Sequence, residues 1–153
     1  MTLADLVRSI NWQDENNRAI GEALISDAEE YMKRVVDHIY KGNEVRADRF
    51  MDFAEKQDEL SRLDRKRTAA HDRMLKSFGP FLDLLKEQPG FDESGYDLSN
   101  RTRIADFVFL TAFELLGIEP SLRTEGSIRD ELAEKIHKGE LSYGQIRDAI
   151  SEK

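Results

Sequence analysis

Apolar side chains recur at helical spacing along most of this chain. From Asn16 onward they stand mainly three or four residues apart, at Ile20, Leu24, Tyr31, Val35, Val36 and Ile39. Such spacing gathers them on one face of an amphipathic helix. Ser26 and Glu29 form a capping-box pattern that can divide the segment in two, and Gly42 is placed to end it as a C-cap. The pattern predicts one or two helices between residues 16 and 41.

A longer helical segment follows. Residues 44–78 contain no Gly or Pro and consist mainly of good helix formers. They predict a single helix of roughly 35 residues, from Glu44 to Phe78, with a length of about 50 Å. Gly79 and Pro80 then predict a turn or kink before a short helix.

The last third of the chain predicts an apolar helix and a helical hairpin. The apolar helix covers residues 102–116, with Ser99 or Asn100 as its cap, and two short amphipathic segments start at Ser127 and Ser142. The fold class predicted is all-α: a helical bundle with one long central helix and a C-terminal helical hairpin. Residues 1–119 form the bundle, and residues 120–153 form the hairpin, packed on or appended to it within a single domain overall.

The composition limits the kinds of site, compartment and partner that the chain can have. A chain of 153 residues suits one domain with a real core. The absence of Cys removes zinc–thiolate sites, thiol nucleophiles and disulfides, and it fits a reducing cytoplasm. The most apolar stretch, residues 104–118, includes two acidic residues and is shorter than the roughly 18 apolar residues that a membrane span needs. With 23 basic and 31 acidic side chains, the net charge of −8 disfavours nucleic acid as a partner.

A polar layer interrupts the apolar seam of the predicted long helix. Spacing of three and four residues connects Phe53, Gln57, Leu60, Asp64, Arg67, His71, Met74 and Phe78. Asp64, Arg67 and His71 therefore fall on or beside the face that should be buried. The favoured interpretation is structural: a buried Asp–Arg pair with a hydrogen-bonded histidine, which fixes helix register or the choice of partner.

Two catalytic alternatives use the same stretch, KRTAAHDRML. His38, the pair His71–Asp72 and a later carboxylate such as Asp106 resemble the HD family of metal phosphohydrolases. That resemblance implies His38, His71 and Asp72 as ligands of a divalent metal that activates water. The family's pair usually lies in an apolar helix before a small residue, whereas here the surroundings are charged, and His71 and Asp72 point about 100° apart on a helix.

The second alternative is a metal-free ribonuclease. Arg67-x3-His71, or Arg65-x5-His71, resembles the motif of the HEPN family, which is all-helical. The resemblance implies that the arginine binds phosphate and that the histidine acts as a general base. The polar residue that usually follows the arginine is missing, since Thr68 or Lys66 stands there. Arg67, His71 and Asp72 are thus the catalytic residues of the hydrolase alternative.

A broader resemblance covers residues 44–116. The segments DRKRTAAHDRML and RTRIADFVFLTAFELL are similar to a family of small uncharacterised helical proteins from Gram-positive bacteria. The resemblance implies an all-helical fold and supplies no activity.

Charge is segregated along the predicted long helix. Residues 44–60 carry six acids and three bases, and residues 62–73 carry five bases and two acids. This arrangement suits the helix macrodipole, and it is also complementary to an antiparallel copy of itself. The sequence therefore favours a non-enzymatic cytoplasmic interaction or regulatory protein over an enzyme. It predicts self-association as a homodimer, a further protein partner of unknown identity, no cofactor and no metal; the small phosphoester hydrolase is the alternative.

Overall fold

The computed structural model describes residues 2–96, 98–116, 128–145 and 148, and no β-strand occurs within them. The elements in chain order are α1 (Leu3–Ser9), α2 (Glu15–Val36), a π-helical turn η1 (Asp37–Lys41), α3 (Gly42–Ala47), α4 (Phe53–Lys86), a 3₁₀ turn η2 (Glu93–Gly95), α5 (Arg101–Leu116) and α6 (Ile128–His137). The predicted all-α class with one long central helix is confirmed. Ser127 and the predicted boundary at residues 119 and 120 lie outside the described residues.

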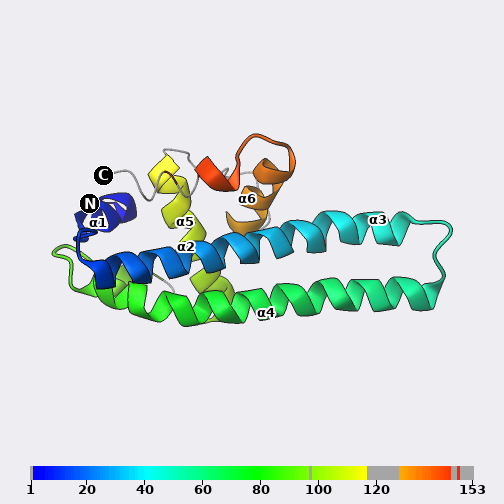
Figure 1. Cartoon of the computed structure of the whole chain (residues 1–153), viewed down its shortest axis with the longest axis horizontal. Coiled ribbons are helices and arrows are strands. Elements are labelled where there is room, and N and C mark those ends of the chain that lie inside the picture. Colours follow the sequence, from blue (N-terminus) through cyan, green and yellow to red (C-terminus); the bar gives the residue numbers. More distant parts are fainter. Residues whose placement is uncertain (1, 97, 117–127, 146–147, 149–153) are drawn as a thin grey trace.

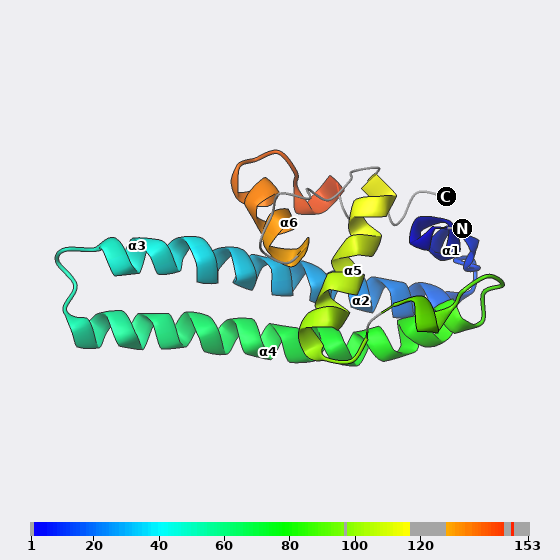
Figure 2. The ribbon, with the colours of Figure 1, turned by 180° about the vertical axis from the view of Figure 1, so that it is seen from behind.

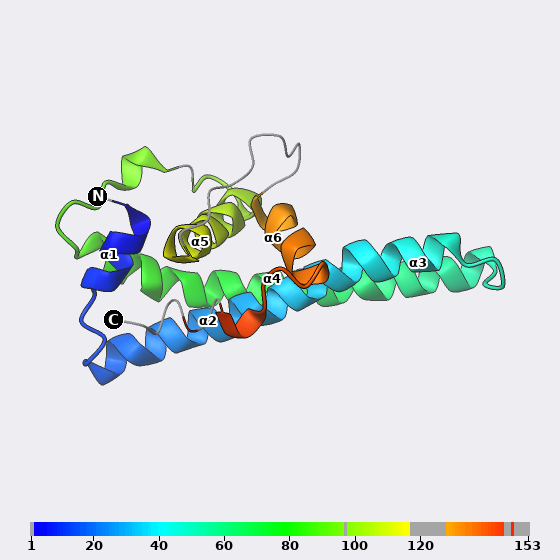
Figure 3. The same cartoon turned by 90° about the horizontal axis from the view of Figure 1, so that it is seen from above.

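Two long helical rods dominate the fold. α2, η1 and α3 follow one another as a nearly continuous rod that packs along α4 (Figure 1). α1, α5 and α6 lie on one side of this pair, and α5 crosses it (Figure 2). Seen from above, these three helices cover only part of the pair, and its far end around α3 projects beyond them (Figure 3). We call this far end, residues 42–62, the arm, and the rest of the described chain the body.

The hydrophobic core lies in the body. Its most deeply buried large side chains come from α1, α2, α4 and α6: Leu3, Leu6, Val7, Tyr31, Met32, Val35, Met74, Leu85 and Leu132. α5 adds Phe107 and Phe109, which are 4% exposed. Burial of so many side chains, at about 1.5–3 kcal/mol each, is the main force that holds the helices together. No helix within the described ranges is long and apolar enough to cross a membrane.

The first predicted helical segment is longer than expected. α2 continues past Ser26 and Glu29 without a break, and Gly42 has helical dihedral angles (φ −59°, ψ −42°) in place of a C-cap conformation. Gly42 is buried, and a carbon atom added there would lie 3.7 Å from Leu60 Cδ2 of α4, an ordinary packing distance. The predicted C-cap at Gly42 was wrong because the glycine continues the helix from η1 into α3 and does not adopt the left-handed conformation of a C-cap.

The predicted long helix was wrong at both ends. α3 ends at Ala47, and a turn leads to α4, which begins at Phe53 and not at Glu44. Two aspartates build the turn: Asp48 Oδ1 accepts the backbone N–H of Phe50 at 2.8 Å, and Asp52 Oδ1 accepts that of Glu55 at 2.8 Å. Short acidic side chains that bond their own backbone can thus end one helix and begin the next without Gly or Pro.

At its other end α4 runs through Gly79 and Pro80 to Lys86. Pro80 lacks the N–H that would continue the helical hydrogen bonding, at a cost of about 3 kcal/mol. Phe78, Phe81, Leu84 and Leu85 flank it and are all buried. Because their burial is worth several times that cost, tertiary packing outweighs the local signal for a turn.

The predicted caps of the later helices are confirmed where they are described. Asn100 Oδ1 accepts the backbone N–H of Arg103 at 3.0 Å, and this bond caps α5. Ser142 and Gln145 form the predicted reciprocal capping box, with bonds of 2.8 Å and 3.2 Å, and residues 143–145 are helical.

Candidate functional site

The histidine of the predicted polar layer lies where α2, α4 and the start of α5 meet. The His71 ring stacks on the fully buried ring of Tyr31, with 4.5 Å between the centroids and 20° between the planes. Its Nε2 lies 3.2 Å from the backbone carbonyl oxygen of Arg101. A carbonyl oxygen can only accept, so Nε2 carries the proton in neutral His71 and Nδ1 keeps a free lone pair.

The other two members of the layer form a pair at the surface. Arg67 Nη2 donates to Asp64 Oδ1 at 2.7 Å, and Asp64 Oδ1 also lies 3.7 Å from His38 Nε2 on η1. The Asp64 side chain is 53% exposed and that of Arg67 is 28% exposed. The structure therefore brings Asp64 and Arg67 together as predicted, but it places the pair at the edge of the α2–α4 contact and not in a dry core.

Arg129 is a site residue that the sequence analysis missed. Its Nη1 donates to the Tyr31 hydroxyl at 2.9 Å, and its Nε lies 2.9 Å from Asp130 Oδ1. This hydrogen bond ties α6 to α2 across 98 positions of sequence. An arginine in a short polar helix gives no sequence signal for such a contact.

These arginines act on both histidines. Burial lowers the pKa of His71; the hydrogen bond to Arg101 opposes it, and the positive charges of Arg101, Arg129 and Arg67 lower that pKa further. Burial also lowers the pKa of His38, assisted by Arg67 and opposed by Asp64. Both imidazoles are therefore held in the neutral form at a lower pH than is usual.

Asp106 on α5 is a partly buried carboxylate close enough to Arg129 to be influenced by its charge. Its Oδ1 is buried and has no hydrogen-bond partner within the described part of the chain. Burial raises the pKa of Asp106, and a backbone hydrogen bond and the charge of Arg129 oppose that rise. A carboxylic acid with a raised pKa can keep its proton closer to neutral pH and donate a hydrogen bond.

The three residues named for the metal alternative have separate partners. His38 faces Asp64, His71 faces the Arg101 carbonyl, and Asp72 pairs with the Arg101 guanidinium. Among the described residues, no group of three or more His, Asp or Glu side chains is arranged to hold a metal ion. The cluster can therefore supply a base and several cations, but it does not bring His38, His71 and Asp72 together as one ligand set.

The second candidate region is the tip of the arm. Phe50 is 99% exposed and Phe53 is 77% exposed, and no other large hydrophobic side chain of the described residues is exposed to this degree. The sequence analysis placed Phe53 on the apolar seam of the predicted long helix, and its exposure shows that this was wrong. Phe50 and Phe53 lie at the turn between α3 and α4, beyond the reach of α1, α5 and α6.

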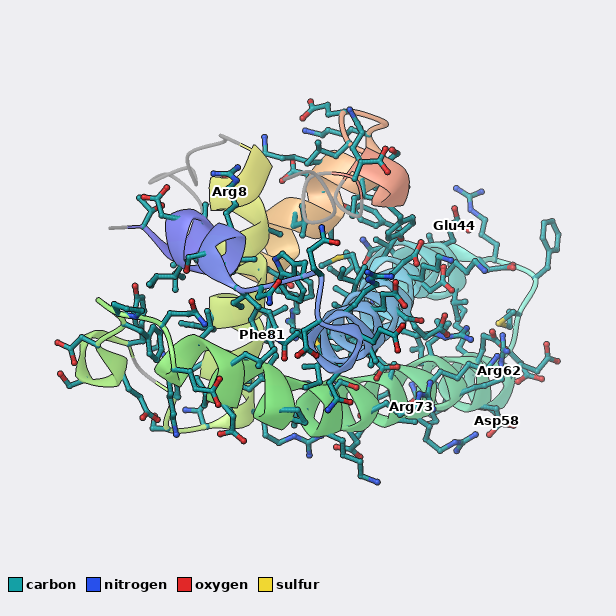
Figure 4. The ribbon with its side chains drawn as sticks, turned by 60° about the vertical axis from the view of Figure 1, so that its left-hand side comes forward. Arg8, Glu44, Asp58, Arg62, Arg73 and Phe81 are labelled. Carbon is teal, nitrogen blue, oxygen red and sulfur yellow. The ribbon has the colours of Figure 1, made fainter. Side chains whose placement is uncertain are left out.

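Acidic and basic side chains are separated along the outer face of α4, within the arm and just beyond it. Glu55, Asp58, Arg62 and Arg65 are all exposed and stand three, four and three residues apart, so they share one face of α4. The two acids lie nearer the tip and the two bases nearer the body. Figure 4 shows Asp58 and Arg62 at the surface of α4, whereas Phe81 lies among the helices of the body.

Comparison of the chain with protein-family models, with curated proteins and with solved structures found no match. The resemblances to the HD and HEPN families and to helical proteins of Gram-positive bacteria stay predictions.

Proposed function

We propose that this chain is a non-enzymatic cytoplasmic interaction protein that self-associates through its arm as a two-fold dimer. The observation that carries the proposal is the exposure of Phe50 and Phe53 at the arm's end. Large apolar side chains grouped on a projecting element are typical of protein interaction sites. An aromatic residue that contributes nothing to the chain's own core is available to a partner.

The charges around the tip favour a protein over a membrane or a nucleic acid. Asp48, Asp52, Glu55 and Asp58 surround the two phenylalanines in sequence, and all but the partly buried Asp48 are exposed. Anionic headgroups and phosphate backbones repel such a cluster. A partner surface that combines apolar and basic groups suits it best.

A second copy of the same chain offers that surface. In an antiparallel pair of α4 helices, Glu55 of each copy lies opposite Arg65 of the other, and Asp58 lies opposite Arg62. Both pairings occur in one register, as a two-fold interface requires. The same register places Met51 and Asp52, which lie between the two phenylalanines, opposite Ala69 and Thr68 of the second copy, which are small and exposed.

Charge reversal tests this assignment. Two double variants are compared: Glu55→Lys with Asp58→Lys, and Arg62→Glu with Arg65→Glu. Each variant places like charges opposite one another in the dimer. Each should therefore be monomeric in native mass spectrometry and analytical ultracentrifugation. Mixing the two variants restores complementarity and should give a heterodimer. Because exposed pairs contribute only about 0.2–1 kcal/mol each, the wild-type dimer should weaken as salt is added.

The control pair is Glu22→Lys with Asp83→Lys, which changes two exposed charges of the body by the same amount. It should leave the dimer intact. A wild-type chain that stays monomeric at high concentration and low salt would reject the proposal, and so would a mixture of the two arm variants that fails to associate.

A second candidate function rests on one observation, the contact of His71 Nε2 with the Arg101 carbonyl oxygen at 3.2 Å. Its Nδ1 keeps a lone pair while Arg67, Arg101 and Arg129 act on the same ring. A neutral imidazole beside cations can serve as a general base in cleavage of a phosphodiester. Cleavage of single-stranded RNA or of a chromogenic phosphodiester by the purified chain, lost in His71→Ala with an unchanged melt, would support this function. Equal cleavage by His71→Ala would assign the activity to a contaminant.

A further inference from the structure

The body contains an apolar cavity that neither the arm nor the polar cluster uses. It lies between α1, α2, α4, α5 and α6, has a volume of about 60 Å³, and is bounded on most sides by Leu24, Met32, Phe81, Phe109, Ala112 and Leu132. A water-sized group takes about 10–15 Å³ on this measure, so the space fits roughly four to six such groups in a row or cluster. That is the size of a short alkyl chain.

The walls give water little to bind. The one hydroxyl of α5 that lines the cavity, that of Thr111, already donates to the carbonyl of Phe107 at 2.9 Å. Cavities with apolar walls stay dry and accept apolar molecules. An unfilled space of this kind also lowers stability, so a ligand that fills it is favoured.

Polar groups stand at one edge of the cavity. Glu29 and Tyr143 contribute to its lining, and Lys33 contacts both: its Nζ lies 3.9 Å from Glu29 Oε1 and 5.3 Å from the centre of the Tyr143 ring. Burial raises the pKa of Tyr143 to about 12, so its hydroxyl stays protonated as a donor. We call these three residues the rim.

We propose that this cavity binds the alkyl chain of a small amphipathic molecule, with the polar end of that molecule at the rim. The walls select the chain by shape and by exclusion of water. The Lys33 ammonium and the Tyr143 hydroxyl donate to a carboxylate or a hydroxyl headgroup. This site is independent of the proposed self-association.

Hexanoate and hexan-1-ol are the probes, because their alkyl chains match a space for roughly four to six groups and they differ in headgroup. Titration of each into the full chain, followed by calorimetry and by NMR of the Leu24, Met32 and Leu132 methyl groups, should show saturable binding. Ala28→Leu and Ala112→Leu fill the cavity from α2 and from α5. Each should weaken binding of both probes at least about tenfold, as loss of a filled apolar site implies.

Ala19→Leu makes the same change at an exposed position of α2 and should bind like the wild type. Circular dichroism melts establish that the filled variants fold, and two variants from different walls guard against the failure of either one. Absence of saturable binding of both probes to the wild type would overturn the proposal. Undiminished binding to both filled variants would overturn it equally.

The rim has its own test. Lys33→Met removes the ammonium group and should weaken binding of hexanoate more than that of hexan-1-ol, since only the carboxylate gains a charge-assisted hydrogen bond. An equal effect on the two probes would reject the rim as the place of the headgroup.

Discussion

The arm and the body are built on the same two helical rods, yet they are held together differently. In the body a third layer, formed by α1, α5 and α6, covers the rods and buries Tyr31, Met74 and Leu85 completely. Along the arm, residues 42–62, only Gly42 is buried. Exposed polar contacts join the two rods there, such as the hydrogen bond of 3.0 Å from Lys56 Nζ to the Arg46 carbonyl.

The comparison teaches that helix formation and apolar burial are separable in this chain. The arm keeps its helices by capping and local hydrogen bonds, while its largest apolar side chains stay outside. The body keeps its helices by burying theirs, even across Pro80. A region with few buried contacts opens at lower free energy than a packed core. The arm is therefore the part of the described chain best suited to change when a partner binds.

The largest expected effect comes from truncating a leucine in each region. Leu85→Ala removes a side chain with 0% exposure from the body and should lower the free energy of unfolding by about 2–5 kcal/mol. Leu60→Ala removes a partly buried side chain of the arm and should cost about 1 kcal/mol or less. Urea unfolding of both variants measures the difference, and equal losses would show that the arm is packed as tightly as the body.

Alanine in place of glycine should have opposite effects in the two regions. At Gly21 in the body, the new Cβ would lie 2.6 Å from Trp12 Cζ3, and the Trp12 ring is fixed by its hydrogen bond to the Val7 carbonyl at 3.0 Å. Crowding of this kind costs about 1–3 kcal/mol and outweighs the gain in helix propensity. At Gly42 the nearest atom, at 3.3 Å, is the mobile Arg46 Nη1, so Gly42→Ala should stabilise by about 0.5–1 kcal/mol.

Gly79→Ala is the control for that pair. It lies inside α4 in the body, but it is exposed, and beyond its chain neighbours and the helix's own backbone a new Cβ meets no atom within 4 Å. Pro80 disfavours the helical conformation of a preceding residue that has a Cβ, so Gly79→Ala should stabilise less than Gly42→Ala, by about 0.5 kcal/mol or less. Thermal melts of the three variants report the order, and a stabilising Gly21→Ala would contradict the tight packing of Trp12.

The same contrast explains how far the sequence could predict the structure. Periodicity located α2 and α5, and the capping pairs at Ser142 and Gln145 were found, because these signals are local. The turn at residues 48–52 was missed because it uses aspartates within a run of helix formers, although Asp52 with Glu55 does form an N-capping pattern. Continuation of α4 through Pro80 depends on what covers Phe81 and Leu85, which no local pattern states.

The contacts of the candidate site likewise divide into those within one helix, which the sequence predicts, and those between helices, which it does not. The Asp64–Arg67 pair follows from a spacing of three residues on one helix, and it was predicted. The contacts of His71 with Tyr31 and of Tyr31 with Arg129 join residues 40 and 98 positions apart, so they depend on how α2, α4 and α6 dock. The exposure of Phe53 was missed for the converse reason: its helical face is apolar, but no third layer reaches it.

A smaller effect should appear as the pH falls. The folded-state pKa values of His38 and His71 lie below the ordinary 6.5, so the unfolded chain binds these protons more readily. Their contribution to stability is then fully present above about pH 6.5 and is lost as the pH falls through the folded-state values. Unfolding at pH 7.5 and 5.5 measures the loss.

The double variant His38→Gln, His71→Gln isolates the two histidines from the carboxylates that also titrate in this range. It should lose less stability than the wild type between the two pH values. An equal loss would mean that burial and the neighbouring charges do not lower the pKa values of these two histidines in the folded chain.

The smallest effect on stability, and the sharpest test of the comparison, is expected at the tip of the arm. Phe50→Ser with Phe53→Ser replaces side chains that are 99% and 77% exposed, so the free energy of unfolding at low protein concentration should change by no more than about 0.5 kcal/mol. Self-association should nevertheless weaken, because these rings contribute apolar area only when a second copy covers them. Phe78→Ser, the same change at a ring that is 4% exposed, should destabilise the chain strongly. Urea unfolding measures the stability of both variants, and sedimentation measures their self-association. A tip variant that unfolds as easily as Phe78→Ser would mean that Phe50 and Phe53 belong to the core. A tip variant that dimerises like the wild type would leave the charges of α4 as the only basis of association.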